Sequence, residues 1–383
     1  MTTLTDVRIT DVEVLILDNG IEYGTRLGDD ERAGPRHTCL IRVATDAGVE
    51  GYGDVDSHPW VVKSIVEAVT HIPAFCAGLR EAAIGQNVWD RNALWDRLYQ
   101  HSWYHGRRGP ALHALSGIDL AVWDICGRLS GQSVASLLGG RRRDRVLAYA
   151  STLLFRETPD EMRAATRSYL DRGFRAIKFG WGPWGSDLSR DRALLAAARA
   201  EAGPDVRLMV DGYLQGDFNA VRRFVSSLED LNPYWVEEPF RADRPRDLAR
   251  LGRETGLTIA SGEQLGGDEF DELLAEPGVS IIQPDLSRCG GFTALQSLAA
   301  TVARSGRHIV PHAWTSPLLT AGTLQAAAWL PDPVMVEYNV STAPISQDLA
   351  TGLSLVDGHV VVPDAPGVGV QINPAVITKY RIA

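Results

Sequence analysis

The sequence predicts an α/β fold in which a parallel (β/α)8-type barrel follows an α+β domain. Eight short apolar or β-branched runs occur between residues 146 and 338, at spacings of roughly 22–31 residues. Helix-like stretches separate them, and each spacing accommodates a strand, a helix and two loops. An open, doubly wound sheet is the alternative, but no GxGxxG motif follows a first strand. The expected strands are Val146–Ser151, Ala176–Trp181, Arg207–Asp211, Tyr234–Glu238, Thr258–Gly262, Ser280–Pro284, His308–His312 and Val334–Tyr338.

The first 130 residues show a different pattern, which predicts the α+β domain. Two segments alternate as strands do, a tetrapeptide bounded by glycines resembles a hairpin turn, and three segments have helical periodicity. In chain order they are Val7–Leu17, His37–Ala44, Gly48–Gly51, Trp60–Val69, Asn87–Gln100 and Leu112–Leu129. We therefore expect an α+β domain (residues 1–130), a barrel (residues 140–345) and a C-terminal segment (residues 350–383) that packs back on the first domain.

Two helices between the expected barrel strands carry clear end signals. Thr158 is a good N-cap, Pro159 suits the first helical position, and Glu161 completes a capping box. Gly173 follows the last turn of that helix. The alanine- and leucine-rich stretch Arg190–Ala202 predicts a second outer helix.

The composition is that of a globular enzyme, with 383 residues, 45% hydrophobic and 22% charged. No apolar run approaches the roughly 18 residues of a membrane span, and the first residues contain no secretory signal. We therefore expect no membrane association and a cytoplasmic location. The net charge of −10 argues against a nucleic-acid partner, because such binding depends largely on Lys and Arg. The four cysteines lack metal-ligand spacing and are expected to be reduced, and the basic run Arg141–Arg145 is interpreted as a solvated loop.

Three acidic residues stand at matching ends of three consecutive strand candidates. Asp211, Glu237 and Glu263 are each 26 residues from the next. In a parallel barrel this places the three carboxylates on one rim, where they form the hard oxygen set that a cation such as Mg²⁺ requires. Any one of them alone is more simply a helix cap or a surface charge, but the shared position of all three favours a metal site. Glu238 competes with Glu237, and strand alternation lets only one of the two face the cation.

At this point the residues resemble the mandelate racemase group of the enolase superfamily. The resemblance covers most of the chain, and its motifs occur in the right order at barrel spacing. They are Ser116–Asp124 with Leu137–Gly140 at the domain junction, Ile177-Lys178, the three carboxylates, Ile281–Asp285 with Gly290-Gly291, Pro311-His312, and Val336-Glu337.

The resemblance implies a (β/α)7β barrel with an N-terminal capping domain and one Mg²⁺ held by Asp211, Glu237 and Glu263. It also implies removal of the proton beside a substrate carboxylate, which gives an enediolate. His312 is then the base, and Asp285 on the preceding strand holds its far nitrogen. Glu337 is expected to donate a proton or a hydrogen bond to the substrate carboxylate.

The second strand departs from the family pattern. Racemases and cycloisomerases of the group commonly carry Lys-x-Lys there, whereas this chain has Lys178-Phe179-Gly180. With no second lysine on the other face, direct racemisation is disfavoured. His312 can instead take the α-proton and assist departure of a β-hydroxyl, which is dehydration of a sugar acid to a 2-keto-3-deoxy acid. Lys178 is expected to support the substrate carboxylate electrostatically.

Other assignments stay open at the level of sequence. Tyr213 is either an acid toward the leaving hydroxyl or a packing residue. Polar and aromatic groups in loops that reach over the barrel mouth are expected to contact the substrate. These are Tyr23, Arg26, His58 and Trp181, with Trp184 as a further wall of the pocket.

The sequence leaves two alternatives to a hydro-lyase. A racemase or epimerase of a 2-hydroxy acid would need Lys178 or Tyr213 as its second acid or base. A ligand-binding barrel without catalysis is the alternative of another class, and the intact set of acidic residues with His312 argues against it. The small-molecule partner is thus predicted to be a sugar acid, and the resemblance further implies a homo-oligomer.

Overall fold

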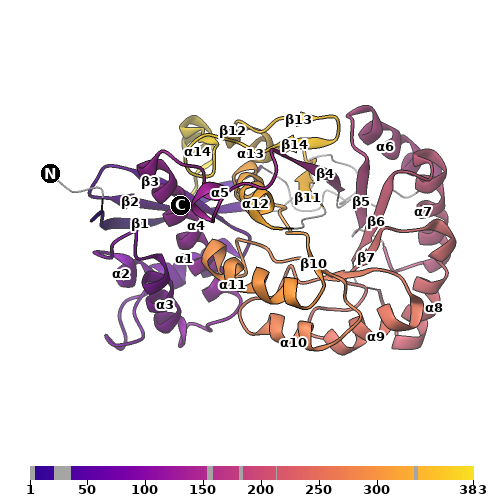
Figure 1. Cartoon of the computed structure of the whole chain (residues 1–383), viewed down its shortest axis with the longest axis horizontal. Helices are drawn as coiled ribbons and strands as arrows, with labels where there is room; N and C mark the ends of the chain where they lie inside the picture. The colour runs from indigo at the N-terminus through magenta and orange to yellow at the C-terminus, as the bar shows by residue number, and fades with distance from the viewer. Residues whose placement is uncertain (1–4, 21–35, 153–157, 181–183, 213, 332–334) are drawn as a thin grey trace.

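The computed structural model describes residues 5–20, 36–152, 158–180, 184–212, 214–331 and 335–383. Its larger part is a barrel of eight parallel strands with seven helices between them, which confirms the predicted (β/α)7β architecture (Figure 1). The strands are β4 (Arg145–Thr152), β5 (Ala176–Gly180), β6 (Arg207–Asp211), β7 (Trp235–Glu237), β8 (Ile259–Ser261), β9 (Ile281–Ile282), β10 (His308–Ile309) and β11 (Val336–Asn339). The helices are α6 (Pro159–Asp171), α7 (Leu188–Ala202), α8 (Phe218–Ser226), α9 (Pro245–Thr255), α10 (Glu269–Ala275), α11 (Gly291–Arg304) and α12 (Pro317–Trp329).

The strands pair in sequence order from β4 to β10, and β11 pairs with β4 on the other side. The β10 and β11 sides are joined where the backbone N–H of Ala313 donates to Glu337 Oε2 at 2.8 Å. Each predicted strand is present, although most are shorter than expected. Of the predicted strand ends, Trp181 and Val334 lie outside the described residues.

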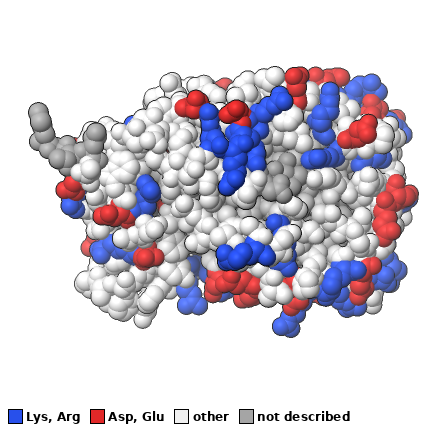
Figure 2. Space-filling view, viewed as in Figure 1, with Lys and Arg blue, Asp and Glu red and all other residues white. Residues whose placement is uncertain are grey.

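The outer helix α6 begins at the capping residues that the sequence predicted. The Thr158 side chain accepts from the backbone N–H of Glu161, whose carboxylate accepts from the N–H of Thr158 at 2.9 Å. This capping box satisfies two N–H groups that the first turn of α6 leaves free. The basic run after residue 140 has a structural role as well, because Arg142 and Arg143 donate to carbonyls at the end of α12. Figure 2 shows basic and acidic side chains side by side on this face.

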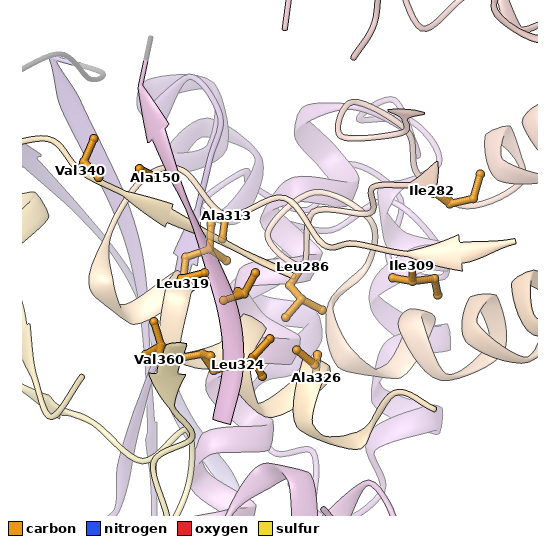
Figure 3. Close-up of a cluster of buried hydrophobic side chains, with 14 of the residues drawn as sticks. Ala150, Ile282, Leu286, Ile309, Ala313, Leu319, Leu324, Ala326, Val340 and Val360 are labelled. Atoms are coloured by element: carbon orange, nitrogen blue, oxygen red, sulfur yellow. The ribbon is translucent and has the colours of Figure 1, made fainter. Parts of the chain in front are cut away.

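The barrel interior is filled by side chains. One residue from or beside each strand contributes to a separate apolar cluster, so the barrel is a packed core rather than a pore. That cluster comprises Tyr149, Ala176, Met209, Trp235, Ala260, Ile281, Val310 and Met335. A larger cluster lies between strands and helices, and it includes Ile282, Ile309 and Leu324 (Figure 3). Because side chains fill the interior, residues that contact a ligand can lie only at the ends of the strands.

In its described residues, the N-terminal capping domain combines a three-stranded antiparallel sheet with four helices. These elements are β1 (Ile9–Asp18), β2 (His37–Thr45), β3 (Glu50–Val55), α1 (Pro59–Val66), α2 (Leu79–Ala83), α3 (Arg91–Ser102) and α4 (Pro110–Ser130). The short helix α2 was missed, because five residues are too few to show a helical period.

The hairpin turn predicted at residues 48–51 lies about two residues earlier in the chain. The chain reverses at residues 46–48, where Gly48 has a φ of 73° and its N–H donates to Thr45 O at 3.1 Å. Gly51 instead belongs to β3, where a Cβ would lie 2.2 Å from Ala121 O of helix α4. This glycine is therefore required for close packing of the sheet on the helix rather than for a turn.

Buried polar contacts fix the capping domain on the barrel. Asp54, in β3, accepts hydrogen bonds from Thr315 at 2.8 Å and from Ser316 at the start of α12. Burial raises the pKa of Asp54 to about 7. Asp119, in α4, accepts from the backbone N–H of Thr293 at 3.1 Å and from its hydroxyl. These contacts hold the end of β3 beside the loops at the barrel mouth.

The C-terminal segment contacts both parts of the chain. Its strand β14 (His359–Val361) pairs antiparallel with β4 of the barrel. At the end of the chain, the N–H of Ile382 donates to Ile16 O and the N–H of Ile16 donates to Ala383 O, both at 2.9 Å. Among the described helices, none combines the length and apolar character needed to cross a membrane.

Candidate active site

Three carboxylates meet at the carboxyl ends of adjacent strands. Asp211 ends β6 and is paired in register with Glu237, the last residue of β7, while Glu263 follows β8 by two residues. All three are buried, and one oxygen from each lies within 4.8 Å of the others. Burial and the charge of Asp211 raise the pKa of Glu237 to about 7. Crowded, buried carboxylates of this kind are stabilised by a cation, and this donor set and spacing fit a divalent one.

Lys178 lies among these acids. Its Nζ is 2.6 Å from Glu237 Oε1, 2.9 Å from Asp211 Oδ2 and 3.2 Å from Glu337 Oε1. Burial opposes the positive charge, but the surrounding carboxylates hold the pKa of this lysine well above its ordinary value. Its side chain is only 3% exposed, so it does not extend to solvent. Lys178 therefore places a buried positive charge among these carboxylates.

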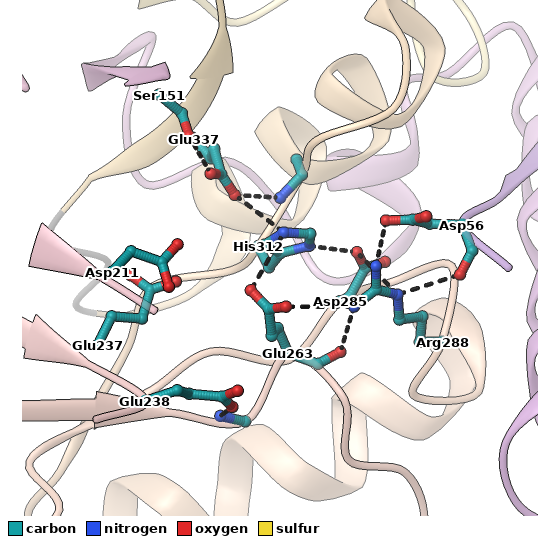
Figure 4. Close-up of polar contacts among 12 residues, drawn as sticks. Asp56, Ser151, Asp211, Glu237, Glu238, Glu263, Asp285, Arg288, His312 and Glu337 are labelled. Carbon is teal, nitrogen blue, oxygen red and sulfur yellow. Dashed lines mark hydrogen bonds and ion pairs between the residues drawn. The ribbon is translucent and has the colours of Figure 1, made fainter. Parts of the chain in front are cut away.

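Asp285, at the neighbouring strand end, orients the imidazole ring of His312. An isolated parallel bridge pairs Asp285 with His312, and Nδ1 lies 2.5 Å from Asp285 Oδ2 (Figure 4). Asp285 is ionised, since burial raises its pKa but the contact with His312 lowers it further. This arrangement places a proton on Nδ1 and leaves Nε2 facing the carboxylates of Glu263, at 3.3 Å, and Glu337, at 3.6 Å.

The carboxylates around the imidazole favour its protonation. Burial alone would favour the neutral ring, but the negative charges of Glu263, Glu337 and Asp285 raise the pKa of the imidazole to about 10. A cation bound to Glu263 would offset the largest of the charge contributions. Filling the carboxylate group with a cation is therefore expected to favour the neutral imidazole that can accept a proton.

Glu337 is arranged as an acceptor. Its Oε1 accepts from Ser151 Oγ at 2.6 Å, and its Oε2 accepts from the backbone N–H of Ala313. Burial raises the pKa of this carboxyl, but Lys178 and His312 bring it down to about 2. The ionised state argues against the predicted donation of a proton to the substrate by Glu337.

A cavity of about 660 Å³ opens over these groups. Capping-domain residues form part of its wall, including Asp56, Ser57 and His113. The barrel contributes Arg288 and Trp314 beside the groups already described. None of these five was singled out from the sequence, because isolated residues carry no periodic signal. For Arg288, its position three residues after Asp285 was the available hint.

Most of the predicted substrate-binding residues are untested by the geometry. Tyr23, Arg26 and Trp181 lie outside the described residues, as does Tyr213, the candidate acid toward the leaving hydroxyl. His58 is exposed at the N-cap of α1, with its ring centroid 5.9 Å from that of Trp60.

The predicted pocket wall at Trp184 is wrong. This side chain is buried and packs edge-on against Phe224 of helix α8, with ring centroids 5.5 Å apart. Its apolar ring is therefore part of the contact between the barrel and an outer helix.

Gly180 stands where the family pattern has its second lysine, and it packs tightly against Asp211, one of the three grouped carboxylates. A Cβ there would lie 2.2 Å from Asp211 O and 2.8 Å from Asp211 Cβ. Gly180→Ala is therefore expected to displace Asp211 and to weaken Mg²⁺ binding by more than about tenfold, as measured by titration calorimetry. Gly322→Ala is the control, because a Cβ there meets only ordinary contacts of 3.6 Å or more. Equal affinity of both variants would contradict this packing argument.

Two family models match the chain over most of its length. One is described as the N-terminal domain of mandelate racemase / muconate lactonizing enzyme and matches residues 33–139. The other is described as enolase C-terminal domain-like and matches residues 161–376.

Characterised proteins resemble the chain along nearly its whole length. The D-galactarolactone cycloisomerase of Agrobacterium fabrum is 33% identical, over 91% of this chain and 92% of that protein. The D-galactonate dehydratase of Pectobacterium atrosepticum is 29% identical, over 90% of this chain and 91% of that protein. The crystal structure of the 3,6-anhydro-D-galactonate cycloisomerase from Zobellia galactanivorans has a TM-score of 0.87 and 25% identity, covering 98% of this chain and 100% of that one.

Proposed function

The chain belongs to the mandelate racemase and muconate lactonizing enzyme family of the enolase superfamily, and from this membership we propose that it is a Mg²⁺-dependent sugar-acid dehydratase. The observation that carries the proposal is the single base beside the carboxylate group. His312 has an oriented imidazole, whereas Gly180 has no side chain at the opposite catalytic position. A relative at 29% identity is named a D-galactonate dehydratase, which supports this class of substrate.

The acidic residues and Lys178 would stabilise the negative charge that forms during the reaction. Asp211, Glu237 and Glu263 would hold Mg²⁺, whose charge stabilises the negative charge that develops on the substrate carboxylate. Lys178 adds a second fixed positive charge on the same side. Together these charges lower the free energy of the enediolate by several kcal/mol, as expected for electrostatic stabilisation in a buried site.

His312 performs both proton transfers. Its Nε2 takes the proton from the carbon beside the carboxylate, and the C–H electron pair enters the enediolate. As the electrons return, the bond from the β-carbon to its hydroxyl breaks, and that hydroxyl takes the same proton from Nε2 and leaves as water. The resulting enol rearranges to a 2-keto-3-deoxy acid. Asp285 keeps the ring oriented and stabilises the imidazolium between the two transfers.

Racemisation fits this geometry less well. It requires an acid or base on each face of the α-carbon, and the Nζ of Lys178 is already paired with the carboxylates of Asp211, Glu237 and Glu337. Among the described residues we therefore assign no second base. The proposed homo-oligomeric state rests on family resemblance.

Opening the ring of a sugar-acid lactone or of an anhydro-sugar acid is a second candidate function. Two of the similar proteins are named cycloisomerases, one of D-galactarolactone and one of 3,6-anhydro-D-galactonate. The same proton abstraction can expel a ring oxygen in place of a hydroxyl. In that case the product has the same mass as the substrate.

Screening hexonates, pentonates, aldarates and their lactones by mass spectrometry and a 2-keto assay tests both functions. For at least one open-chain acid, we expect an Mg²⁺-dependent product that has lost one water and carries a 2-keto group. An isomeric product from a lactone alone would select the second candidate. An epimer as the product from every active acid would contradict both.

A further inference from the structure

Arg288 lies where the capping domain meets both the base and the carboxylate group. Its side chain is 15% exposed, Nη1 is 3.5 Å from Glu263 Oε1, and Nε is 4.0 Å from Asp285 Oδ2. Nη1 also donates to the backbone oxygen of Glu263 at 3.3 Å. One guanidinium thus adjoins a proposed metal ligand and the carboxylate that orients the base.

Asp56 holds this guanidinium from the side of the capping domain. Nη2 of Arg288 donates to Asp56 Oδ2, and Nε donates to the backbone oxygen of Asp56 at 3.1 Å (Figure 4). Two donors on one planar group fix its orientation as well as its position. The direction in which Arg288 faces the barrel is therefore set by a residue of the other domain.

A second path joins the same capping-domain residue to the base. The N–H of Asp56 donates to Ser287 Oγ at 3.1 Å. Ser287 donates its own N–H and hydroxyl to Asp285 Oδ1, both at 2.6 Å. Because Asp285 Oδ2 binds the imidazole, an unbroken sequence of hydrogen bonds runs from Asp56 to His312.

The electrostatics favour the same arrangement. Asp56, Asp285 and His312 form a second group whose ligand atoms lie within 4.8 Å of one another, a spacing that would also suit a cation. Arg288 lies against two of them and supplies that positive charge from the protein itself. Removing the Asp56 carboxylate takes from Arg288 its nearest ion-pair partner, and removing Arg288 takes from Asp56 and Asp285 the guanidinium that they share.

We propose that Asp56 and Arg288 form a clasp through which the capping domain positions the reaction centre of the barrel. Arg288 fixes Glu263, and with Ser287 it fixes Asp285, so both are held in the geometry that the reaction needs. The proposal rests on the proposed function for the task of that centre. Asp56 and Arg288 act as positioning residues, because they reach the chemistry through other side chains.

Asp56→Asn tests the clasp by removing the carboxylate charge while keeping the backbone contacts. We expect kcat on the best sugar acid to fall about 10- to 100-fold, as for other outer contacts of metal ligands and bases. KM should stay within about threefold, because the lost geometry matters mainly in the transition state. The low-field proton NMR signal of His312 Nδ1 should exchange faster with solvent. Asp56→Glu should recover part of kcat, because it restores the charge.

Asp268→Asn is the matched control. It breaks another Arg–Asp pair between the two parts of the chain, with Arg108 Nη2 2.6 Å from Asp268 Oδ2, in a more exposed place away from the reaction centre. It should leave kcat and the NMR signal unchanged. Arg288→Lys keeps the positive charge but loses the planar guanidinium that donates to two oxygens of Asp56, so it should also lower kcat. This variant tests the clasp if Asp56→Asn does not fold.

The outcomes separate the clasp from the proposed function. If Asp56→Asn and Arg288→Lys match Asp268→Asn in kcat and in proton exchange, the clasp is wrong. If the wild-type protein converts no sugar acid, while Asp56→Asn still speeds the exchange of the Nδ1 proton, the proposed function is wrong and the clasp stands.

Discussion

Replacing His312 with asparagine is expected to lower kcat by about 10³- to 10⁴-fold, because the imidazole that Asp285 orients beside the carboxylate group is lost. Asparagine can still donate to Asp285, so the local packing is retained. Its amide cannot accept a proton at neutral pH. Steady-state kinetics on the best acid in the screen measures the effect.

His308→Asn provides the matched control for this variant. His308 begins strand β10, three residues before Pro311, and its side chain is exposed. The same substitution there should leave kcat within about twofold of wild type. If His312→Asn retains full activity at saturating Mg²⁺, then His312 is not the base.

Replacing Glu237 with glutamine is expected to weaken Mg²⁺ binding by more than about 100-fold and to abolish turnover at millimolar Mg²⁺. The substitution removes a buried carboxylate charge. This carboxylate contacts the Nζ of Lys178 and forms the possible metal site with Asp211 and Glu263. Calorimetric titration with Mg²⁺ measures the affinity. Thermal unfolding gives a second readout, since a ligand at about 100 times its Kd stabilises the folded state by about 2.7 kcal/mol. That increase in the free energy of unfolding should disappear in the variant.

The adjacent Glu238 supplies the control for the metal site. It is also buried, but it accepts hydrogen bonds from Ser261 at 3.0 Å and from the N–H of Gly262, and it is not in the group that could hold the cation. Glu238→Gln should change Mg²⁺ affinity by less than about tenfold. Stronger loss in Glu238→Gln than in Glu237→Gln would reverse the assignment of the two glutamates.

The distinction between these two glutamates shows where sequence reasoning was adequate and where it was incomplete. Strand alternation correctly implied that Glu237 and Glu238 differ in their surroundings. The structure adds that Glu238 has a φ of 39°, a left-handed conformation that ends the strand directly after Glu237. This local break was not visible in the residue pattern, because the pattern treats both residues as extended.

The rim of the barrel was predictable because its residues recur with the strands. Asp211, Glu237 and Glu263 share one offset from three apolar runs, and the pairing of Asp285 with His312 follows from neighbouring strand ends. Asp56 and Arg288 share no such period, and they are 232 positions apart in the chain. Their contact depends on how two separately folded parts dock, which a single sequence does not encode as a local signal.

The sequence also could not predict the charge states of the site. The resemblance implied that Glu337 donates a proton or a hydrogen bond, and the structure adds that Lys178 and His312 lower the pKa of this carboxyl. The pKa of a buried carboxyl depends on distances to a few neighbours, and spacing in the chain does not give those distances.

Turnover of a sugar acid in D₂O, followed by NMR and mass spectrometry, tests the central claim that one base serves proton abstraction and loss of water. The expected result is a 2-keto-3-deoxy acid formed with loss of water, while the remaining substrate keeps its configuration at the α-carbon. Epimerised substrate that carries deuterium at the α-carbon and has lost no water would contradict the account, because it requires a second acid or base on the opposite face.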